Sequence, residues 1–141
     1  MRNRNSHHRG SRRGVALVEL AISLTLLLTI VLGCVDAGRF AYSYISVSNA
    51  TSEAATFASL HAPGEFGEME QWTAAVRQRA IDEAPRLNPQ IAAADFNVDT
   101  SVLSQGLISV SVAYTFETLV PWPHLPQQYP MNRRVILSQT P

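Results

Sequence analysis

The feature that most constrains this chain is an apolar run of about twenty residues that begins directly after two arginines. Residues 15–35 contain a single charged side chain, Glu19, and the run is preceded by Arg12-Arg13-Gly14. A helix needs a run of this length to cross the hydrocarbon core of a bilayer. An ionised carboxylate in that core costs roughly 2.5 kcal/mol or more, so we expect Glu19 to have a partner and a function.

The charges on either side of the run are distributed unevenly, although they sum to zero. The 11 basic and 11 acidic residues balance, which gives no reason to expect a nucleic-acid partner. Five arginines and no acidic residue precede the run, and Asp36 follows it at once. This asymmetry follows the positive-inside rule. It predicts a single-pass protein with a cytoplasmic N-terminus and an exported remainder.

These patterns divide the chain into four segments. Residues 1–14 form a basic cytoplasmic leader, expected to be disordered up to Arg13. Residues 15–35 are predicted to be the transmembrane helix, and residues 36–62 its amphipathic continuation, because no proline interrupts the chain before that point. Residues 63–141 are predicted to form a small exported α+β domain.

The continuation of the helix carries a stripe of larger side chains at helical spacing, expected to pack on the protein's own globular part or on a neighbour's helix. A row of small residues lies closer to the membrane. These residues are four apart, so they share one face of the helix and would let another helix approach closely. The stripe consists of Phe40, Tyr44, Val47, Ala54 and Phe57, and the row consists of Gly33, Ala37 and Ala41.

The exported domain is predicted to contain one helix and a three-stranded antiparallel sheet packed on the helices. The helix begins at about Glu68 and stops at Pro85. Its expected core side consists of Trp72, Val76, Ala80 and Ala84. The strands are predicted around residues 96–102, 108–117 and 131–138. The second alternates without a miss, which places Ser109 on the face expected to meet water.

A proline-rich segment, residues 121–126, separates the last two predicted strands and carries Trp122. Closely spaced prolines predict a stiff, extended loop, and such a loop can present a binding surface at low entropic cost. Trp122 would then be a contact residue. Alternatively, Trp122 covers one edge of the sheet.

The N-terminal pattern resembles that of type IV pilins and pseudopilins, in which a prepilin peptidase cuts after a glycine and a glutamate stands fifth in the mature chain. The first 60 residues further resemble the TadE family, minor pilin-like proteins of the tight-adherence (Tad, or Flp) pilus apparatus. The residues that carry this resemblance are Arg13-Gly14, Val18-Glu19, Gly33, Asp36, Gly38-Arg39, Tyr42, Asn49-Ala50 and Glu53-Ala54-Ala55.

The resemblance implies cleavage between Gly14 and Val15, which makes Glu19 the fifth residue. Glu19 would then neutralise the new amine of its own or a neighbouring subunit. The implied role is non-enzymatic assembly of a pilus, with a type IV pilin-like architecture in the bacterial inner membrane and a periplasmic or extracellular C-terminal domain. The implied partners are the prepilin peptidase, other pilin-like subunits and the Tad pilus machinery.

Other interpretations of the same residues stay open. Glu19 would need no partner if it reached the cytoplasmic interface or were protonated, and Gly14 would be incidental if it merely started the helix. Residues 31–34 loosely resemble a lipobox, in which Cys34 would be lipidated. The alternative function is therefore a membrane- or lipid-anchored periplasmic binding module without a filament role.

The sequence offers little that suggests an enzyme. His7 and His8 have no cysteine or carboxylate nearby to complete a metal site. A nucleophile elbow and a glycine-rich phosphate-binding loop are both missing. We therefore expect no catalytic residues, no metal, no cofactor and no small-molecule substrate.

Overall fold

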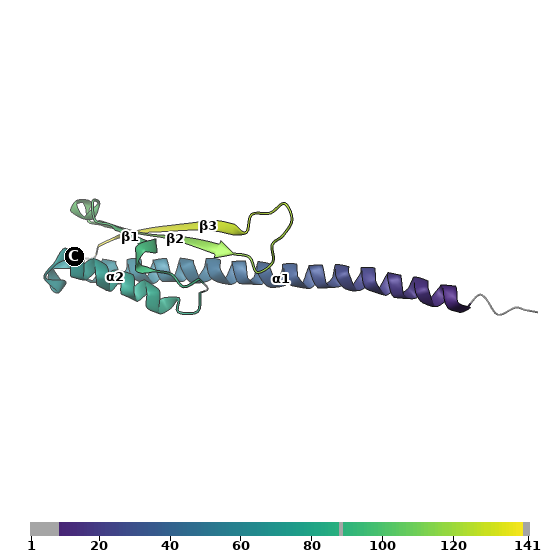
Figure 1. Ribbon diagram of the computed structural model, residues 1–141. Coiled ribbons are helices and arrows are strands. Elements are labelled where there is room, and N and C mark those ends of the chain that lie inside the picture. Colours follow the sequence, from purple (N-terminus) through teal and green to yellow (C-terminus); the bar gives the residue numbers. More distant parts are fainter. Residues whose placement is uncertain (1–8, 88, 140–141) are drawn as a thin grey trace, which may run out of the picture. The chain divides into compact units, whose positions relative to one another are not determined.

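The computed structural model describes residues 9–87 and 89–139, with side chains from Gly14 onward apart from that of Ser104. The chain divides into two compact units. The N-terminal unit ends at Ala37 and the C-terminal unit begins at Gly38. The long helix α1 contributes residues to both units, which are therefore described one at a time (Figure 1).

Helix α1 extends from Arg9 to Leu60 and so begins earlier than the sequence predicts. The disorder expected for the leader is wrong for residues 9–13, which are helical. Arginine is a good helix former, and Gly10 is the only glycine in these residues that opposes an extra turn. The rest of the leader, residues 1–8, lies outside the described residues.

The C-terminal end of α1 lies where the prolines predict it. Ala62 is extended, with φ −72° and ψ 147°, the conformation favoured before a proline. A short 3-10 helix, η1 (Pro63–Phe66), follows, and Gly67 has a positive φ of 78° that few other residues adopt readily. The chain thereby turns back into the second helix.

Helix α2 (Met69–Glu83) confirms the predicted second helix. Trp72 anchors it: the side chain is fully buried, and its indole N–H donates a hydrogen bond of 2.8 Å to the carbonyl of His61, just past α1. The indole therefore buries its ring without leaving its donor unpaired. The buried residues of this helix are Trp72, Val76 and Ala80.

Three strands form one antiparallel sheet in the order β1-β2-β3. They are β1 (Phe96–Asp99), β2 (Leu107–Glu117) and β3 (Gln128–Ser138). Two further 3-10 turns, η2 (Ala93–Asp95) and η3 (Leu103–Gln105), flank β1. Strands β2 and β3 pair over their whole length, while β1 pairs only with residues 109–112 of β2.

Two strand ends differ from the predicted ones. Strand β3 begins at Gln128, three residues before Met131, because Pro130 is accommodated in an edge strand. Strand β1 stops at Asp99, so Val102 is not part of it. The Asp99 carboxylate accepts the backbone N–H of Ser101 at 3.0 Å, a local bond that turns the chain out of the strand.

Ser109 is buried, although the alternation along β2 placed it on the water-facing side. The reason is the neighbouring strand: the Nε of Arg134 donates a hydrogen bond of 2.8 Å to the Ser109 hydroxyl. The long arginine side chain thus covers a small hydroxyl, and both groups gain a partner. Burial on this face of β2 depends on tertiary contact rather than on side-chain polarity.

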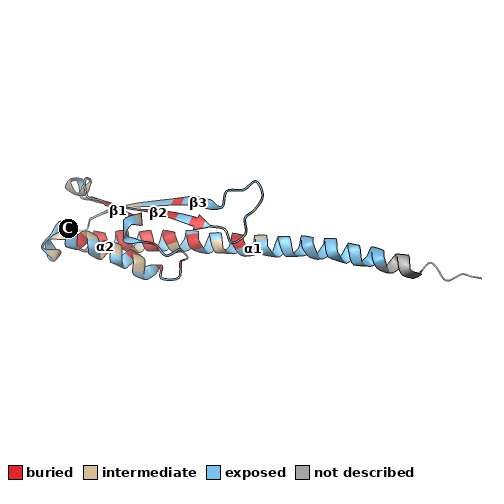
Figure 2. Ribbon diagram, in the orientation of Figure 1, coloured by how far each residue is buried: buried red, intermediate tan, exposed pale blue. Residues whose placement is uncertain are grey.

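The face of α1 that is buried in the C-terminal unit includes Val47 and Ala54 of the predicted stripe and otherwise consists of small side chains; Figure 2 colours the buried residues red. Val47 and Ala54 are buried, but Phe40 and Tyr44 are exposed and Phe57 is half-buried. Small side chains allow close packing of backbones. The buried residues on this face are Ser43, Val47, Ala50, Thr51, Ala54, Ala55, Ala58 and Ser59.

One hydrophobic core joins this face of α1 to α2 and the sheet. Strand β2 contributes the residues that alternate toward the helices: Ile108, Val110, Val112, Tyr114 and Phe116. The architecture confirms the predicted α+β class, with a long N-terminal helix, a second small helix and a three-stranded antiparallel sheet.

Candidate functional site

The apolar first half of α1 exposes its large side chains. From Val15 to Val35 every leucine, isoleucine and valine is exposed, and Figure 2 draws this stretch almost entirely in the colour of exposed residues. The helix is long and apolar enough to cross a membrane. Because exposed apolar surface of this extent is unfavourable in water, the N-terminal unit is compatible with a single-pass membrane anchor.

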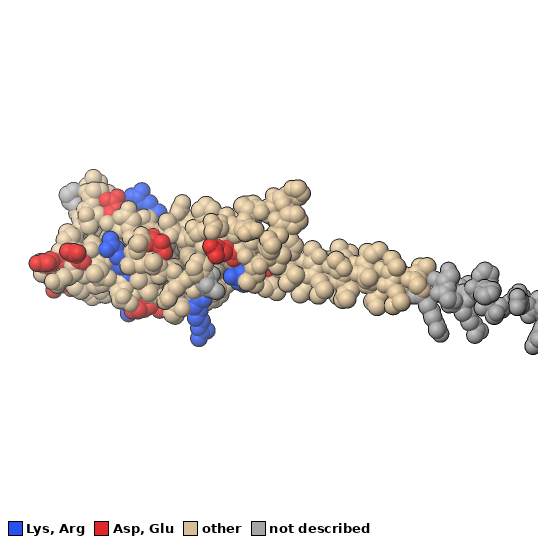
Figure 3. Space-filling model, viewed as in Figure 1, with Lys and Arg blue, Asp and Glu red and all other residues tan. Residues whose placement is uncertain are grey.

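Glu19 is the only charged side chain that the structure describes between Gly14 and Val35. Gly14, Val15 and Glu19 are all exposed, and Val15 and Glu19 stand four residues apart in one helix, so their side chains share a face. Among the side chains that the structure describes, none hydrogen-bonds to Glu19 or pairs with it. In the view of Figure 3, the part of the apolar run that is drawn in tan shows no blue or red side chain.

Gly14 has open space around it. A Cβ built on this residue would meet nothing within 4 Å, apart from its own helix backbone and its chain neighbours. A glycine inside a helix costs roughly 0.5–1 kcal/mol relative to alanine. The described part of the chain therefore offers no steric reason for a glycine at this position.

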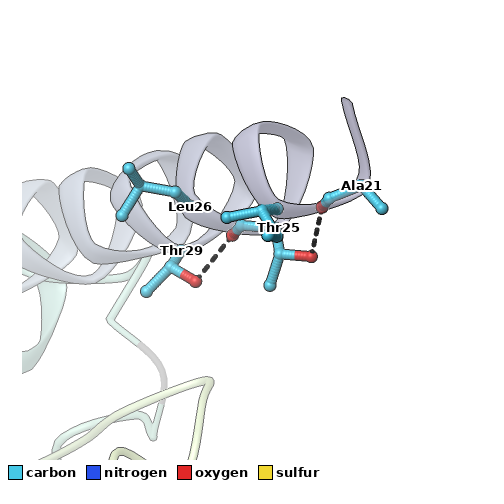
Figure 4. Close-up of a pocket in the computed structure, with 5 residues that line it drawn as sticks. Ala21, Thr25, Leu26 and Thr29 are labelled. Carbon is cyan, nitrogen blue, oxygen red and sulfur yellow. Dashed lines mark hydrogen bonds between the residues drawn. The ribbon is translucent and has the colours of Figure 1, made fainter. Parts of the chain in front are cut away.

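The threonines of the apolar half keep their hydroxyls satisfied within the helix. Thr25 donates to the carbonyl of Ala21 and Thr29 to that of Thr25, both at 2.8 Å (Figure 4). These residues line a shallow hollow on the helix surface together with Ile22 and Leu26. This back-bonding leaves neither threonine donor unpaired in an apolar medium.

The predicted row of small residues is available for contact. Gly33 is half-buried, and Ala37 and Ala41 are exposed. In the C-terminal unit, Gly38 is also exposed, and a Cβ added to it would meet nothing within 4 Å. The role predicted for this row, close packing against another helix, stays a prediction.

An exposed apolar patch next to that row escaped sequence reasoning. Tyr42 and Ile45 lie on α1 with more than half of their surface exposed. The sequence predicted only the stripe that contains Phe40 and Tyr44. A signal was present, because a glycine in the middle of a helix, here Gly38, often marks a close approach of another molecule.

The loop that contains Trp122 is not extended as predicted. The Leu125 N–H donates to the Trp122 carbonyl at 3.3 Å, and His124 has a φ of 68°. With Pro123 before it, His124 adopts the arrangement of a type II turn, in which Pro123 fixes one position and the next needs a positive φ. Trp122 itself is half-buried, and its predicted contact role is not decided by its position.

The end of the sheet beside this loop is fixed to α1 by Arg39. One guanidinium nitrogen of Arg39 donates to the Glu117 carbonyl at 3.3 Å, and its carbon lies 5.3 Å from the centre of the Phe116 ring. Phe40 meets Phe116 edge-on at 5.4 Å. Burial raises the pKa of Tyr114, while the nearby Ser43 hydroxyl and the Arg39 guanidinium act in the opposite direction.

Within the described residues, no group of three or more histidine, cysteine, aspartate or glutamate side chains could hold a metal ion. Cys34 is a free, exposed thiol. His7 and His8 lie outside the described residues.

The comparison with protein families gives one match. Residues 14–56, less than half of the chain, match the family of TadE-like proteins. This confirms the resemblance inferred from the sequence and relates the segment to pilin-like proteins associated with a Tad pilus. No curated protein and no solved structure matches the chain.

Proposed function

We propose, on the premise that residues 14–56 are TadE-like, that this protein is a pseudopilin that takes part in assembling a tight-adherence (Flp-type) pilus. The family match is the observation that carries the proposal. The apolar half of α1 would anchor the protein in a bacterial inner membrane, with the N-terminus cytoplasmic and the C-terminal unit periplasmic or extracellular. The role is non-catalytic and uses no cofactor.

The proposed processing site lies between Gly14 and Val15. The family match begins at Gly14, the residue after which a prepilin peptidase would cut. Nothing in the described chain packs against Gly14, so its missing side chain is better explained by a requirement of another protein. An enzyme that accommodates the chain in a narrow site before cleavage would impose such a requirement.

The proposed role of Glu19 is to neutralise the amine that cleavage creates. An α-amino group has a pKa of about 7.7–8.0, so the new terminus of Val15 would carry a positive charge. Glu19 has no partner among the described side chains, and it shares a helix face with Val15. Pairing the two ions in an apolar medium offsets part of the cost of removing each from water.

The proposed assembly surface is the exposed apolar side of α1. The small residues Gly33, Ala37 and Ala41 would admit a helix of another pilin-like subunit, and Gly38 adds open space beside them. Association in a membrane depends on such close packing, because lipid is already as apolar as the side chains. The partners would be other pilin-like subunits of the Tad machinery.

The replacement Glu19→Gln tests the proposal in the native host. It keeps the size of the side chain and removes its charge, so we expect normal membrane insertion with loss of surface pili. Thr25→Val serves as the matched control, because the Thr25 hydroxyl bonds only within its own helix. Normal pili in the Glu19→Gln strain would contradict the proposal and favour an anchored binding module.

A further inference from the structure

The loop between β2 and β3, residues 118–127, exposes large apolar side chains without any charge. Leu119 is 63% exposed and Leu125 is 57% exposed. The loop contains three prolines and no aspartate, glutamate, lysine or arginine. Exposed loops of soluble proteins are usually polar, and a patch of exposed apolar residues marks a contact site. The loop is therefore a candidate contact surface for an apolar partner.

The loop is held in a defined shape. At its base the Thr118 N–H donates to the Gln127 carbonyl at 3.0 Å, and at its tip the turn from Trp122 to Leu125 is closed by a hydrogen bond. His124 adopts a left-handed conformation there, which costs a non-glycine residue roughly 1 kcal/mol or more. The structure thus maintains exposed leucines at some cost, rather than folding them into the core.

The base of the loop is linked to the end of the apolar run by a short stretch of chain. Glu117, the last residue before the loop, accepts a hydrogen bond from Arg39. Arg39 is four residues beyond Val35, the last residue of the predicted membrane span. Four residues reach at most about 14 Å even when fully extended. The length of these four residues and of the arginine side chain therefore limits how far from the end of the predicted span the loop can begin.

The side chains of α1 just past the predicted span are those typical of a membrane surface. Phe40, Tyr42 and Tyr44 are all exposed, and aromatic rings concentrate at membrane–water interfaces. The loop and the first turns of α1 in the C-terminal unit thus both expose large apolar or aromatic side chains.

We propose that the loop at residues 118–127 inserts into the headgroup boundary of the bilayer that α1 spans, with Leu119, Trp122 and Leu125 as its contacts. The occupant of the apolar surface is lipid on the exported side of the membrane. The loop gives the C-terminal unit a second attachment beside α1. This inference rests on the proposed membrane anchoring.

Nitroxide accessibility in the full-length protein tests the inference. Each variant carries one label in a Cys34→Ser background, in nanodiscs that contain a single copy. Leu125→Cys reports on the loop. Gln105→Cys, exposed in the turn before β2 and so at the opposite end of the sheet, is the matched control. Leu26→Cys, in the apolar run, reports on membrane anchoring itself.

We expect the label at position 125 to lose collisions with a water-soluble nickel chelate and to gain collisions with oxygen, relative to the label at position 105. Equal accessibility at positions 125 and 105, with position 26 protected, would overturn the inference and leave the anchoring intact. Nickel access at position 26 would overturn the anchoring and the inference together. Protection at position 125 only when two copies share a nanodisc would indicate a protein contact and also overturn it.

Discussion

The two parts of α1 use their apolar residues in opposite ways. Before Ala37 the large side chains are exposed, whereas in the C-terminal unit small residues such as Ala50 and Ala54 are fully buried against the sheet and α2. The first part must obtain its burial from lipid or from another subunit, and the second obtains it from its own chain. The same helix therefore contributes to the fold in one half, and in the proposed function it serves anchoring and assembly in the other.

The carboxylates repeat this contrast. Asp99, in the C-terminal unit, has Ser101 and Arg134 as partners within its own chain, with Arg134 at 3.4 Å. Glu19 has none among the described side chains. A carboxylate in an apolar segment without an internal partner has to find one outside the chain or lose its charge. This difference is the physical basis for assigning Glu19 to assembly.

Among the substitutions that test this contrast between the two units, Trp72→Ala is expected to change stability most. Trp72 is fully buried and hydrogen-bonded, so its truncation should lower the free energy of unfolding of the C-terminal unit by about 3–5 kcal/mol. Urea unfolding of the full chain in detergent, followed by circular dichroism, measures this loss. The control Leu26→Ala removes an exposed side chain of the other unit and should not move that transition. If Trp72→Ala and Leu26→Ala lowered the free energy of unfolding equally, the difference between the two parts of α1 would be contradicted.

A smaller effect separates the two faces of α1. Ala54→Leu adds volume at a site with no exposed surface, and overpacking of this kind costs about 1–3 kcal/mol. Ala41→Leu makes the same change on an exposed face, so the unfolding free energy should not fall, while cross-linking to partner subunits in membranes should weaken. Destabilisation by Ala41→Leu as large as that by Ala54→Leu would show that this face is also buried by the protein's own chain.

The smallest effect is an acid dependence at Asp99. Hydrogen bonding from the Ser101 side chain, then from its backbone, and the nearby Arg134 hold the pKa of Asp99 below its ordinary value. Because the folded-state pKa is lowered, this contribution to stability is present above the ordinary aspartate pKa, about 3.9, and is lost as the pH falls below it. Asp99→Asn should flatten the fall in urea midpoint below pH 4. If the urea midpoint of Asp99→Asn fell below pH 4 as steeply as that of the wild type, other carboxylates would be responsible for the fall.

The sequence was sufficient to predict those parts of the fold that depend on a local pattern. Proline positions predicted the end of α1 and of α2, and strict alternation predicted β2, because backbone restriction and side-chain period act over a few residues. The match to the TadE-like family over residues 14–56 also confirms what the spacing of glycine and acidic residues indicated.

The failures arose where tertiary contact decides the outcome. Phe40 and Tyr44 have the hydrophobicity of core residues, yet both are exposed. The side of α1 that is buried carries mainly alanines, because small side chains let the helix pack closely. Ser109 is buried only because Arg134 on the neighbouring strand reaches across it. The turn at His124 requires a positive φ, and a histidine in the sequence gives no reason to predict one. None of these contacts can be inferred from one segment alone.

The measurement that tests the central claim most directly is the N-terminal sequence and intact mass of the protein extracted from its host membranes, with and without the host's prepilin peptidase. The pseudopilin account predicts a chain that begins at Val15 only when the peptidase is present, with Glu19 as its fifth residue. A full-length chain in both strains, or a chain that begins at a lipidated Cys34, would contradict it.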